Sequence, residues 1–115
     1  MNVTFQTLDK ILVCAVSGEV DLYAAPDLHG NYTAMAAKEP SLAFVCDLSG
    51  ATYMDSSGIG VLFQIYSDTR HRKVPFRVCG VTGMVKQLFA LSKMGAILPV
   101  TGTRQEAIDS IRSST

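Results

Sequence analysis

The chain has 115 residues, of which 48% are hydrophobic and 17% are charged, values typical of one folded globular domain and unlike those of disordered chains. Ten basic residues balance ten acidic ones, so no net charge attracts the chain to nucleic acid or anionic lipid. The opening residues lack a signal-peptide pattern, and no apolar run approaches the length of a membrane span. We therefore expect a cytoplasmic protein with one domain over residues 1–115 and neither nucleic acid nor membrane as a partner.

The three cysteines are Cys14, Cys46 and Cys79. They are an odd number, lie far apart in the sequence, and each sits inside an apolar stretch. No C-x-x-C spacing that would indicate a metal or redox site is present. Free cysteine is among the most often buried residue types. The pattern therefore favours buried core residues on strands, in a protein of a reducing compartment, over reactive thiols.

The first half of the chain predicts a hairpin, a helix and a central strand. Residues 3–8 and 11–17 favour strands, and the two residues between them indicate a tight antiparallel turn. A helix is expected from Pro26, a residue that the first helical turn tolerates, to shortly before Pro40. Its apolar residues recur at helical spacing at Leu28, Tyr32, Met35 and Ala36. Residues 42–48 are almost continuously apolar, as in a strand covered on both faces.

The second half predicts three more helices and two short strands. A helix is expected from Ser57 to about Arg70, then a strand over 76–79 after Pro75. Thr82 is placed to begin the next helix, with Gly95 beyond its end as a stop, and residues 97–100 form another apolar strand. The last helix begins at a capping box, a pattern in which Thr103 and Glu106 each satisfy the other's free backbone N–H.

This order of elements predicts an α/β fold, because strands that alternate with helices form parallel sheets through right-handed crossovers. We expect a mostly parallel central sheet of about five strands, an N-terminal antiparallel hairpin and about four helices. In such sheets the functional loops lie at the carboxyl ends of the strands.

One such loop, in residues 47–60, is expected to join the central strand to the second helix. Asp55, Ser56 and Ser57 lie at the start of this helix, and N-capping alone would explain these residue types. Gly58 and Gly60 are harder to explain, since each costs a helix about 1 kcal/mol relative to alanine. Glycine lets a backbone or a large anion approach closely, and a helix start suits a phosphate group. Packing of the helix against the sheet is a competing explanation for either glycine.

The same residues carry a resemblance to the STAS domain family, in particular to bacterial anti-sigma factor antagonists. The chain matches the family motif D-S-[ST]-G-[IL]-G completely, and Tyr53-Met54 before it also resembles the family. Further similarities cover Gly18 to Asp21 with the following Ala25-Pro26, the strand end Asp47-Leu48-Ser49, and residues 85–89. The resemblance extends over essentially the whole chain.

The resemblance implies that the chain works by partner switching and is not an enzyme. The family's phosphorylated serine corresponds to Ser56. The unphosphorylated form would bind an anti-sigma factor that is also a serine kinase and so free a sigma factor, which regulates transcription; the phosphorylated form would release it until a protein phosphatase restores the serine. ATP and magnesium would belong to the kinase, so no cofactor, metal or catalytic residue is expected in this chain.

Seven further residues are expected around Ser56 or at the partner surface, and several have a purely structural alternative. Asp55 resembles a residue that orients the phosphorylated serine, and Asp21 resembles an acid near it, although Asp21 also suits a turn. Ser57 is expected as the N-cap, and Gly58 and Gly60 complete the surroundings of Ser56. Ile59 and Leu88 resemble family positions that face the partner, although apolar helix residues are more often core.

Two other interpretations of the chain are considered. A STAS scaffold of a larger sensory assembly would use the fold mainly to oligomerise, whereas we expect a monomer or weak dimer. An enzyme with Ser56 as nucleophile would need a base, but His29 and His71 stand in ordinary contexts and no G-x-S-x-G motif is present. The basic run 70–73 is expected to be a solvated loop, although the family commonly has a glycine in this connection.

Overall fold

The computed structural model describes residues 1–113 and begins with the expected hairpin. Strands β1 (Asn2–Leu8) and β2 (Ile11–Val20) pair antiparallel. The turn between them places Asp9 at a φ of 59°, in the left-handed region that aspartate tolerates better than most residues. The last two residues of the expected domain 1–115 lie outside the described residues.

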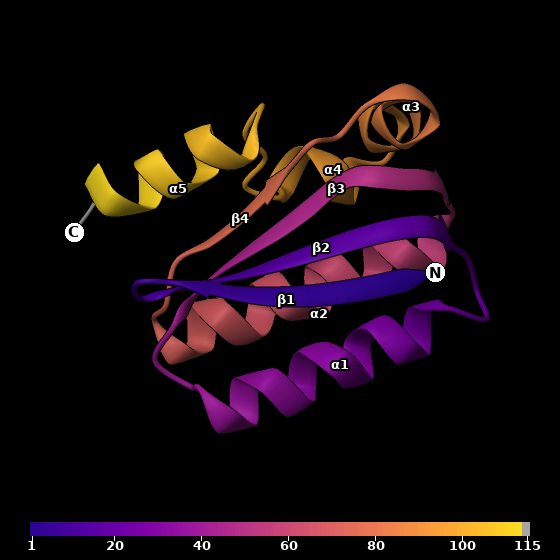
Figure 1. Cartoon of the computed structure of the whole chain (residues 1–115). Helices are drawn as coiled ribbons and strands as arrows, with labels where there is room; N and C mark the ends of the chain where they lie inside the picture. Colours follow the sequence, from indigo (N-terminus) through magenta and orange to yellow (C-terminus); the bar gives the residue numbers. More distant parts are fainter. Residues whose placement is uncertain (114–115) are drawn as a thin grey trace.

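The elements after the hairpin alternate between helix and strand (Figure 1). They are α1 (Ala25–Lys38), β3 (Ala43–Met54), α2 (Ser56–Arg72), β4 (Phe76–Cys79), α3 (Gly83–Leu91), α4 (Lys93–Ile97) and α5 (Arg104–Ser113). The strand order in the sheet is β1-β2-β3-β4, with β3 parallel to both β2 and β4. The predicted α/β class, with a mixed sheet opened by an antiparallel hairpin, is confirmed.

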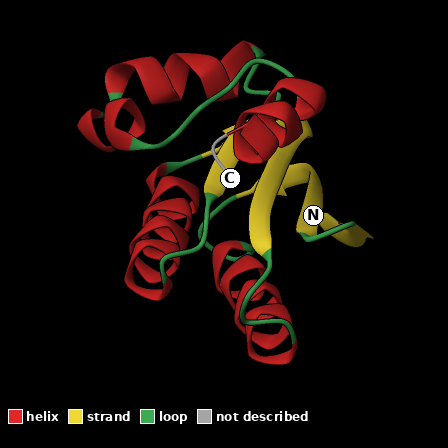
Figure 2. Cartoon of the chain, turned by 90° about the vertical axis from the view of Figure 1, so that its left-hand side faces the viewer, coloured by secondary structure: helices red, strands yellow, loops and turns green. Residues whose placement is uncertain are grey.

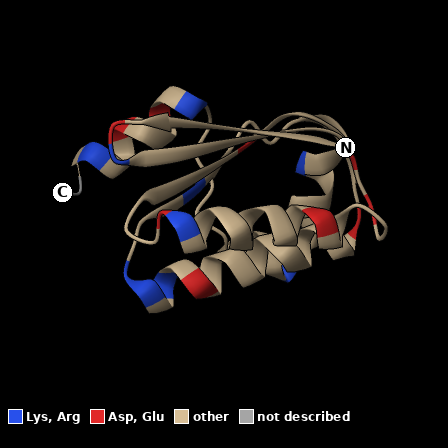
Figure 3. Ribbon diagram, turned by 60° about the horizontal axis from the view of Figure 1, so that its bottom comes forward, with Lys and Arg blue, Asp and Glu red and all other residues tan. Residues whose placement is uncertain are grey.

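The sheet separates two apolar clusters of unequal size. Helices α1 and α2 lie together on one face, and α5 lies on the other (Figures 1 and 2). The larger cluster includes Leu28 of α1 and Leu62 of α2, and it extends to Val85 and Phe89 of α3. The smaller cluster joins α5 to the strands through residues such as Ile108 and Val45. Basic and acidic residues are both spread over several helices and loops (Figure 3).

The predicted strand over residues 97–100 is wrong. A short helix, α4, occupies residues 93–97 instead, and only Val100 forms a single bridge, to Val78. Gly95, expected as a helix stop, lies buried inside α4. A side chain at this position would meet the backbone oxygen of Phe89 at 2.5 Å. Gly95 thus allows α4 to pack closely against the end of α3. Over residues 1–113 the sheet therefore has four strands, with five helices.

Strand β3 is longer than predicted, since it continues to Met54 rather than ending at residue 48. From the sequence, residues 49–53 are expected in the connection between the central strand and the second helix. They instead extend the pairing with β2, where Gly18 lies opposite Ala51 and Val20 opposite Met54, and two register shifts along this pairing each place one extra residue in β3. Asp55 alone therefore connects the central strand to α2.

The basic run 70–73 is exposed at three of its four residues, as predicted, but it is not a loop. Residues 70–72 form the last turn of α2, and Lys73 is the C-cap with a left-handed φ of 61°, the conformation that glycine adopts most easily. Arg72 donates hydrogen bonds to the carboxylate of Asp68, the hydroxyl of Tyr32 and the backbone oxygen of Pro40. This cluster ties α1 to α2, and burial, followed by the hydrogen bond to Asp68, raises the pKa of Tyr32 to about 12.

All three cysteines are buried on strands, as predicted. A hydrogen bond with Cys14, together with burial, raises the pKa of Cys46 well above its ordinary value. Burial and the nearby charge of Asp47 raise the pKa of Cys79 to about 12. All three thiols are buried, so none is accessible to a reagent in the folded protein.

We expect the folded protein to be inert toward an aromatic disulfide reagent at pH 8, with three thiols reacting after denaturation. The absorbance of the released thiolate measures both states of the same sample. Rapid reaction of one or more thiols in the folded protein would contradict the packing described above.

Candidate functional site

The candidate site lies where β2 and β3 end side by side. Val20 and Met54 are the last paired residues, and an aspartate follows each of them. Asp55 is the N-cap of α2, and one of its carboxylate oxygens accepts a hydrogen bond from the backbone N–H of Ser57 at 2.9 Å. The other oxygen accepts from the backbone N–H of Leu22 at 3.1 Å. A single carboxylate therefore caps the helix and holds the loop between β2 and α1.

Asp21 shapes this loop. Its carboxylate accepts hydrogen bonds from the backbone N–H groups of Tyr23 at 3.0 Å and Ala24 at 2.9 Å, and its backbone oxygen accepts from Ala25 at 2.9 Å. The interpretation of Asp21 as a turn residue is confirmed. Its expected place near a phosphorylated serine stays a prediction.

Ser56 is the first residue of α2 and is exposed. Within residues 1–113 its hydroxyl makes none of the side-chain hydrogen bonds observed, so it is free to react. Asp55 already occupies much of the helix start: its carboxylate accepts from Ser57, and its backbone oxygen accepts from Gly58 at 3.1 Å and Ile59 at 3.3 Å. An anion on Ser56 would therefore share this helix start with the carboxylate of Asp55.

Ser57 is not the N-cap that the sequence predicted. Asp55 takes that position because its extended backbone, with φ of −112° and ψ of −172°, directs its carboxylate back to the Ser57 N–H. Ser57 itself lies within the first turn of α2 and is half-buried. Asp55 and Ser57 are both residue types that cap helices and lie two positions apart, and the position of the strand end decides between them.

The two glycines of α2 have different surroundings. A side chain at Gly58 would meet Cγ of Met54 at 2.6 Å and the backbone oxygen of Val20 at 3.1 Å, so Gly58 allows α2 to begin close against the strand ends. A side chain at Gly60 would meet nothing within 4 Å. Packing therefore explains Gly58, whereas no contact in the described residues explains Gly60.

Alanine at these two positions should have opposite effects on stability. We expect Gly60→Ala to raise the free energy of unfolding by about 0.5–1 kcal/mol through helix propensity. Gly58→Ala should lower it by about 1–2 kcal/mol, because overpacking outweighs that gain. Urea denaturation of both variants measures the difference, and each variant is the other's control. Equal effects of the two substitutions would show that Gly58 is not packed as described.

Ile59 does not face a partner, contrary to the expectation. It is 2% exposed and belongs to the larger core cluster, because the first turn of α2 presents this position to the sheet. Leu88 on α3 is half-buried and packs against the same cluster. Its expected role at a partner surface stays a prediction.

The sequence interpretation did not single out Leu22 and Tyr23, which are 63% and 86% exposed. Both lie in the loop that Asp55 holds beside Ser56. Met84, in the first turn of α3, is also exposed. Strand β4, which precedes α3, runs parallel to β3, so α3 begins at the same edge of the sheet as α2. The sequence feature that could have indicated this surface is the pair Leu22-Tyr23 in a loop, between the turn residue Asp21 and Pro26 in the first turn of α1.

No group of three metal-ligating side chains lies together in residues 1–113. None of the helices in this range is long and apolar enough to cross a membrane.

Comparison with known proteins identifies the family. The sequence model of the STAS domain matches residues 2–107, so the chain belongs to the STAS domain family. An anti-sigma-B factor antagonist of Staphylococcus aureus is 27% identical over 107 residues, which cover 92% of this chain and 98% of that protein. One of Listeria monocytogenes is 28% identical over 91 residues, or 79% of each chain.

A solved structure has the same architecture at a similar level of identity. The anti-sigma factor antagonist of Mycobacterium paratuberculosis superimposes with a TM-score of 0.83 at 26% identity, and the match covers 96% of this chain and 93% of that one. At 18% identity, the unphosphorylated form of the anti-sigma factor antagonist SpoIIAA gives a TM-score of 0.82 with 97% of each chain covered, a likeness that concerns the fold.

Proposed function

We propose that this protein is an anti-sigma factor antagonist whose binding to its partner is switched by phosphorylation of Ser56. The observation that carries the proposal is the position of Ser56, an exposed and unengaged hydroxyl at the first residue of α2. It follows Asp55 directly, and the carboxylate of Asp55 holds the backbone of the loop that carries the exposed residues Leu22 and Tyr23. The relatives from Staphylococcus aureus and Listeria monocytogenes are named anti-sigma-B factor antagonists, which supports the same function.

The apolar loop offers a surface for binding. Aromatic and large aliphatic side chains provide most of the binding energy at protein interfaces, and Leu22 and Tyr23 are held in place by backbone hydrogen bonds to Asp55 and Asp21. Gly60 lies one helical turn from Ser56 on the same face of α2, with open space around it. It therefore leaves the backbone of α2 accessible to a close approach by the partner.

A phosphate on Ser56 would oppose that binding. It adds about −1.5 to −2 charge at neutral pH next to Asp55. The carboxylate of Asp55 already accepts from the Ser57 N–H, and its backbone oxygen accepts from those of Gly58 and Ile59. When a partner covers this surface, the charge loses its water without gaining a counterion. Burying such an unpaired charge costs several kcal/mol, enough to release the partner.

The partner in this proposal is an anti-sigma factor with serine kinase activity, and a protein phosphatase restores Ser56. This chain is the substrate of both, a regulatory binding protein of the cytoplasm and not an enzyme. ATP and magnesium act in the kinase. We propose one STAS domain over residues 1–115, with Asp21, Asp55, Gly58 and Gly60 shaping the surroundings of Ser56 and with Leu88 available at the edge of the surface.

The test is the intact mass of the protein after incubation with ATP, magnesium and the candidate anti-sigma factor kinases of its source organism. We expect the gain of one phosphoryl group, lost in Ser56→Ala and kept in Ser57→Ala, the matched control one residue away. Failure of every candidate kinase to modify the protein, or modification that persists in Ser56→Ala, would contradict the proposal.

A further inference from the structure

Strand β1 is an open edge of the sheet. Within residues 1–113, β2 is its one strand neighbour, since the strand order is β1-β2-β3-β4. Its other side faces outward (Figures 1 and 2). An edge strand presents backbone N–H and C=O groups that can pair with another chain.

The hydrogen bonds of β2 determine which groups of β1 point outward. The backbone oxygen of Lys10 accepts from Ala43 of β3, so Lys10 and every second residue after it are directed toward β3. The residues between them, Ile11, Val13 and Ala15, are directed toward β1 and lie opposite Leu8, Gln6 and Thr4. In β1, the backbone groups of Leu8, Gln6 and Thr4 therefore point toward β2. Those of the residues between and beyond them, Val3, Phe5 and Thr7, point to the open side.

The sequence of β1 lacks the features that commonly protect an open edge. Natural edges are often blocked by charged residues, proline or a bulge. Residues 2–8 contain no charged residue and no proline, and all seven pair with β2 without a register shift. Four of them are Asn2, Thr4, Gln6 and Thr7, whose polar, uncharged side chains are exposed.

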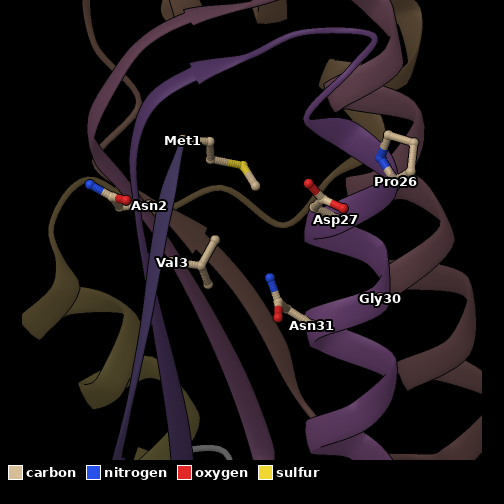
Figure 4. A pocket seen from close by; sticks show the side chains of 7 residues that line it. All are labelled: Met1, Asn2, Val3, Pro26, Asp27, Gly30 and Asn31. Atoms are coloured by element: carbon tan, nitrogen blue, oxygen red, sulfur yellow. The ribbon is translucent and has the colours of Figure 1, made fainter.

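Space beside the edge is open on the face of the sheet that α1 and α2 cover. A hollow of about 420 Å³ separates the start of β1 from α1 (Figure 4), and it is lined by Met1, Asn2, Val3, Pro26, Asp27, Gly30 and Asn31. A side chain added at Gly30 would meet nothing within 4 Å. On the opposite face, the exposed side chains of Thr4 and Gln6 show that α5 does not reach along β1. A second strand therefore has room to align with β1.

We propose that this edge binds a second copy of the same chain, through antiparallel pairing of the two β1 strands about a two-fold axis at Phe5. In this register Val3 lies opposite Thr7 of the second copy, and the two Phe5 residues lie opposite each other. The outward-pointing residues thus match one another, and each of the three pairs exchanges two backbone hydrogen bonds. A partner with a different sequence would have to supply this same spacing of free groups.

The charge distribution also fits a second copy. In a two-fold pairing, identical strands meet, so any charge on β1 would face or flank its own duplicate; residues 2–8 have none. The net charge of zero removes long-range repulsion between the two molecules. The pairing buries little surface, and interfaces smaller than about 1,200 Å² are typical of weak, reversible complexes. We therefore expect the dimer to populate between about 10 μM and about 1 mM.

The test is sedimentation velocity of the full chain over this concentration range, with charge variants at Thr4 and Gln6. In the proposed register, Thr4 lies opposite Gln6 of the second copy. The variant Thr4→Lys/Gln6→Lys places like charges opposite each other at two positions and should remain monomeric. The matched variant Thr4→Lys/Gln6→Glu places opposite charges there and should dimerise at least as strongly as the native chain.

Both positions are exposed, and circular dichroism of each variant checks that the fold is kept. A native chain that stays monomeric up to about 1 mM would overturn the proposal. Equal behaviour of the two charge variants would overturn it as well, because it would place the dimer interface elsewhere. The substitutions leave Ser56 unchanged, so phosphorylation of the same variants tests the proposed function separately.

Discussion

Replacing Ser56 with aspartate should weaken binding to the cognate anti-sigma factor at least tenfold, or by about 1.4 kcal/mol. The side chain places a permanent negative charge beside the carboxylate of Asp55, at the centre of the surface formed with Leu22 and Tyr23. Acidic residues are favourable in the first turn of a helix, so the variant should fold normally. Isothermal titration of the anti-sigma factor with each variant measures the change.

Two controls isolate the effect of this position. Ser56→Ala removes the hydroxyl without adding charge and should bind as tightly as the native chain. Ser67→Asp adds the same charge at another exposed serine of the same helix, and it should leave the affinity unchanged. If Ser67→Asp weakened binding as much as Ser56→Asp does, net charge rather than the position of Ser56 would control the complex.

Removing Arg104 should destabilise the protein because Arg104 is the counterion of a buried carboxylate. Asp47 is 6% exposed, and its carboxylate accepts a hydrogen bond from Nε of Arg104 at 2.8 Å and from the backbone N–H of Ser49 at 2.9 Å. Arg104→Ala leaves this buried carboxylate without its counterion. We expect a loss of about 2 kcal/mol in the free energy of unfolding at pH 7, measured by urea denaturation.

The pH dependence of this loss gives a second measurement. Burial alone would raise the pKa of Asp47, but the hydrogen bonds from Ser49 and Arg104 outweigh it and hold the pKa below its ordinary value. The ion pair therefore contributes stability above the unfolded pKa of about 3.9, and that contribution is lost as the pH falls through the lower folded pKa. The difference between native and Arg104→Ala should shrink as the pH is lowered from 7 toward 3.

A double variant provides the control for this pair. Asp47→Asn/Arg104→Ala removes the buried charge together with its counterion, so it should cost less at pH 7 than Arg104→Ala alone. A larger cost of the double variant, or a loss in Arg104→Ala that does not change with pH, would contradict an unpaired carboxylate as the cause.

The sequence predicted correctly those helices and strands whose local residue pattern favours the same structure as their tertiary packing. The hairpin turn, the helix that begins at Pro26 and the buried strand cysteines all follow from patterns a few residues long. The pattern failed at residues 97–100, where an apolar run of strand length belongs to α4 and a single bridge. The deciding contact there, Gly95 against the backbone of Phe89, joins two helices and leaves no periodic signal.

At the candidate site, too, the sequence predicted the residues of the motif but not the surroundings that tertiary packing gives them. Ser56 follows from the motif, but its exposure and the two hydrogen bonds of the Asp55 carboxylate depend on where β3 ends. The apolar run ends at residue 48, so it did not indicate that the strand continues to Met54. Ile59 and Leu22 are both apolar residues close to Ser56. Tertiary packing places Ile59 in the core and leaves Leu22 exposed, and the type of residue alone cannot distinguish them.

The most direct measurement is the dissociation constant of the anti-sigma factor for two samples of the native protein, one unmodified and one fully phosphorylated on Ser56. We predict that the phosphorylated sample binds at least tenfold more weakly and regains its affinity when a phosphatase removes the group. Equal affinity of the two samples would mean that the phosphate at the start of α2 does not control binding, and the proposed switch would be wrong.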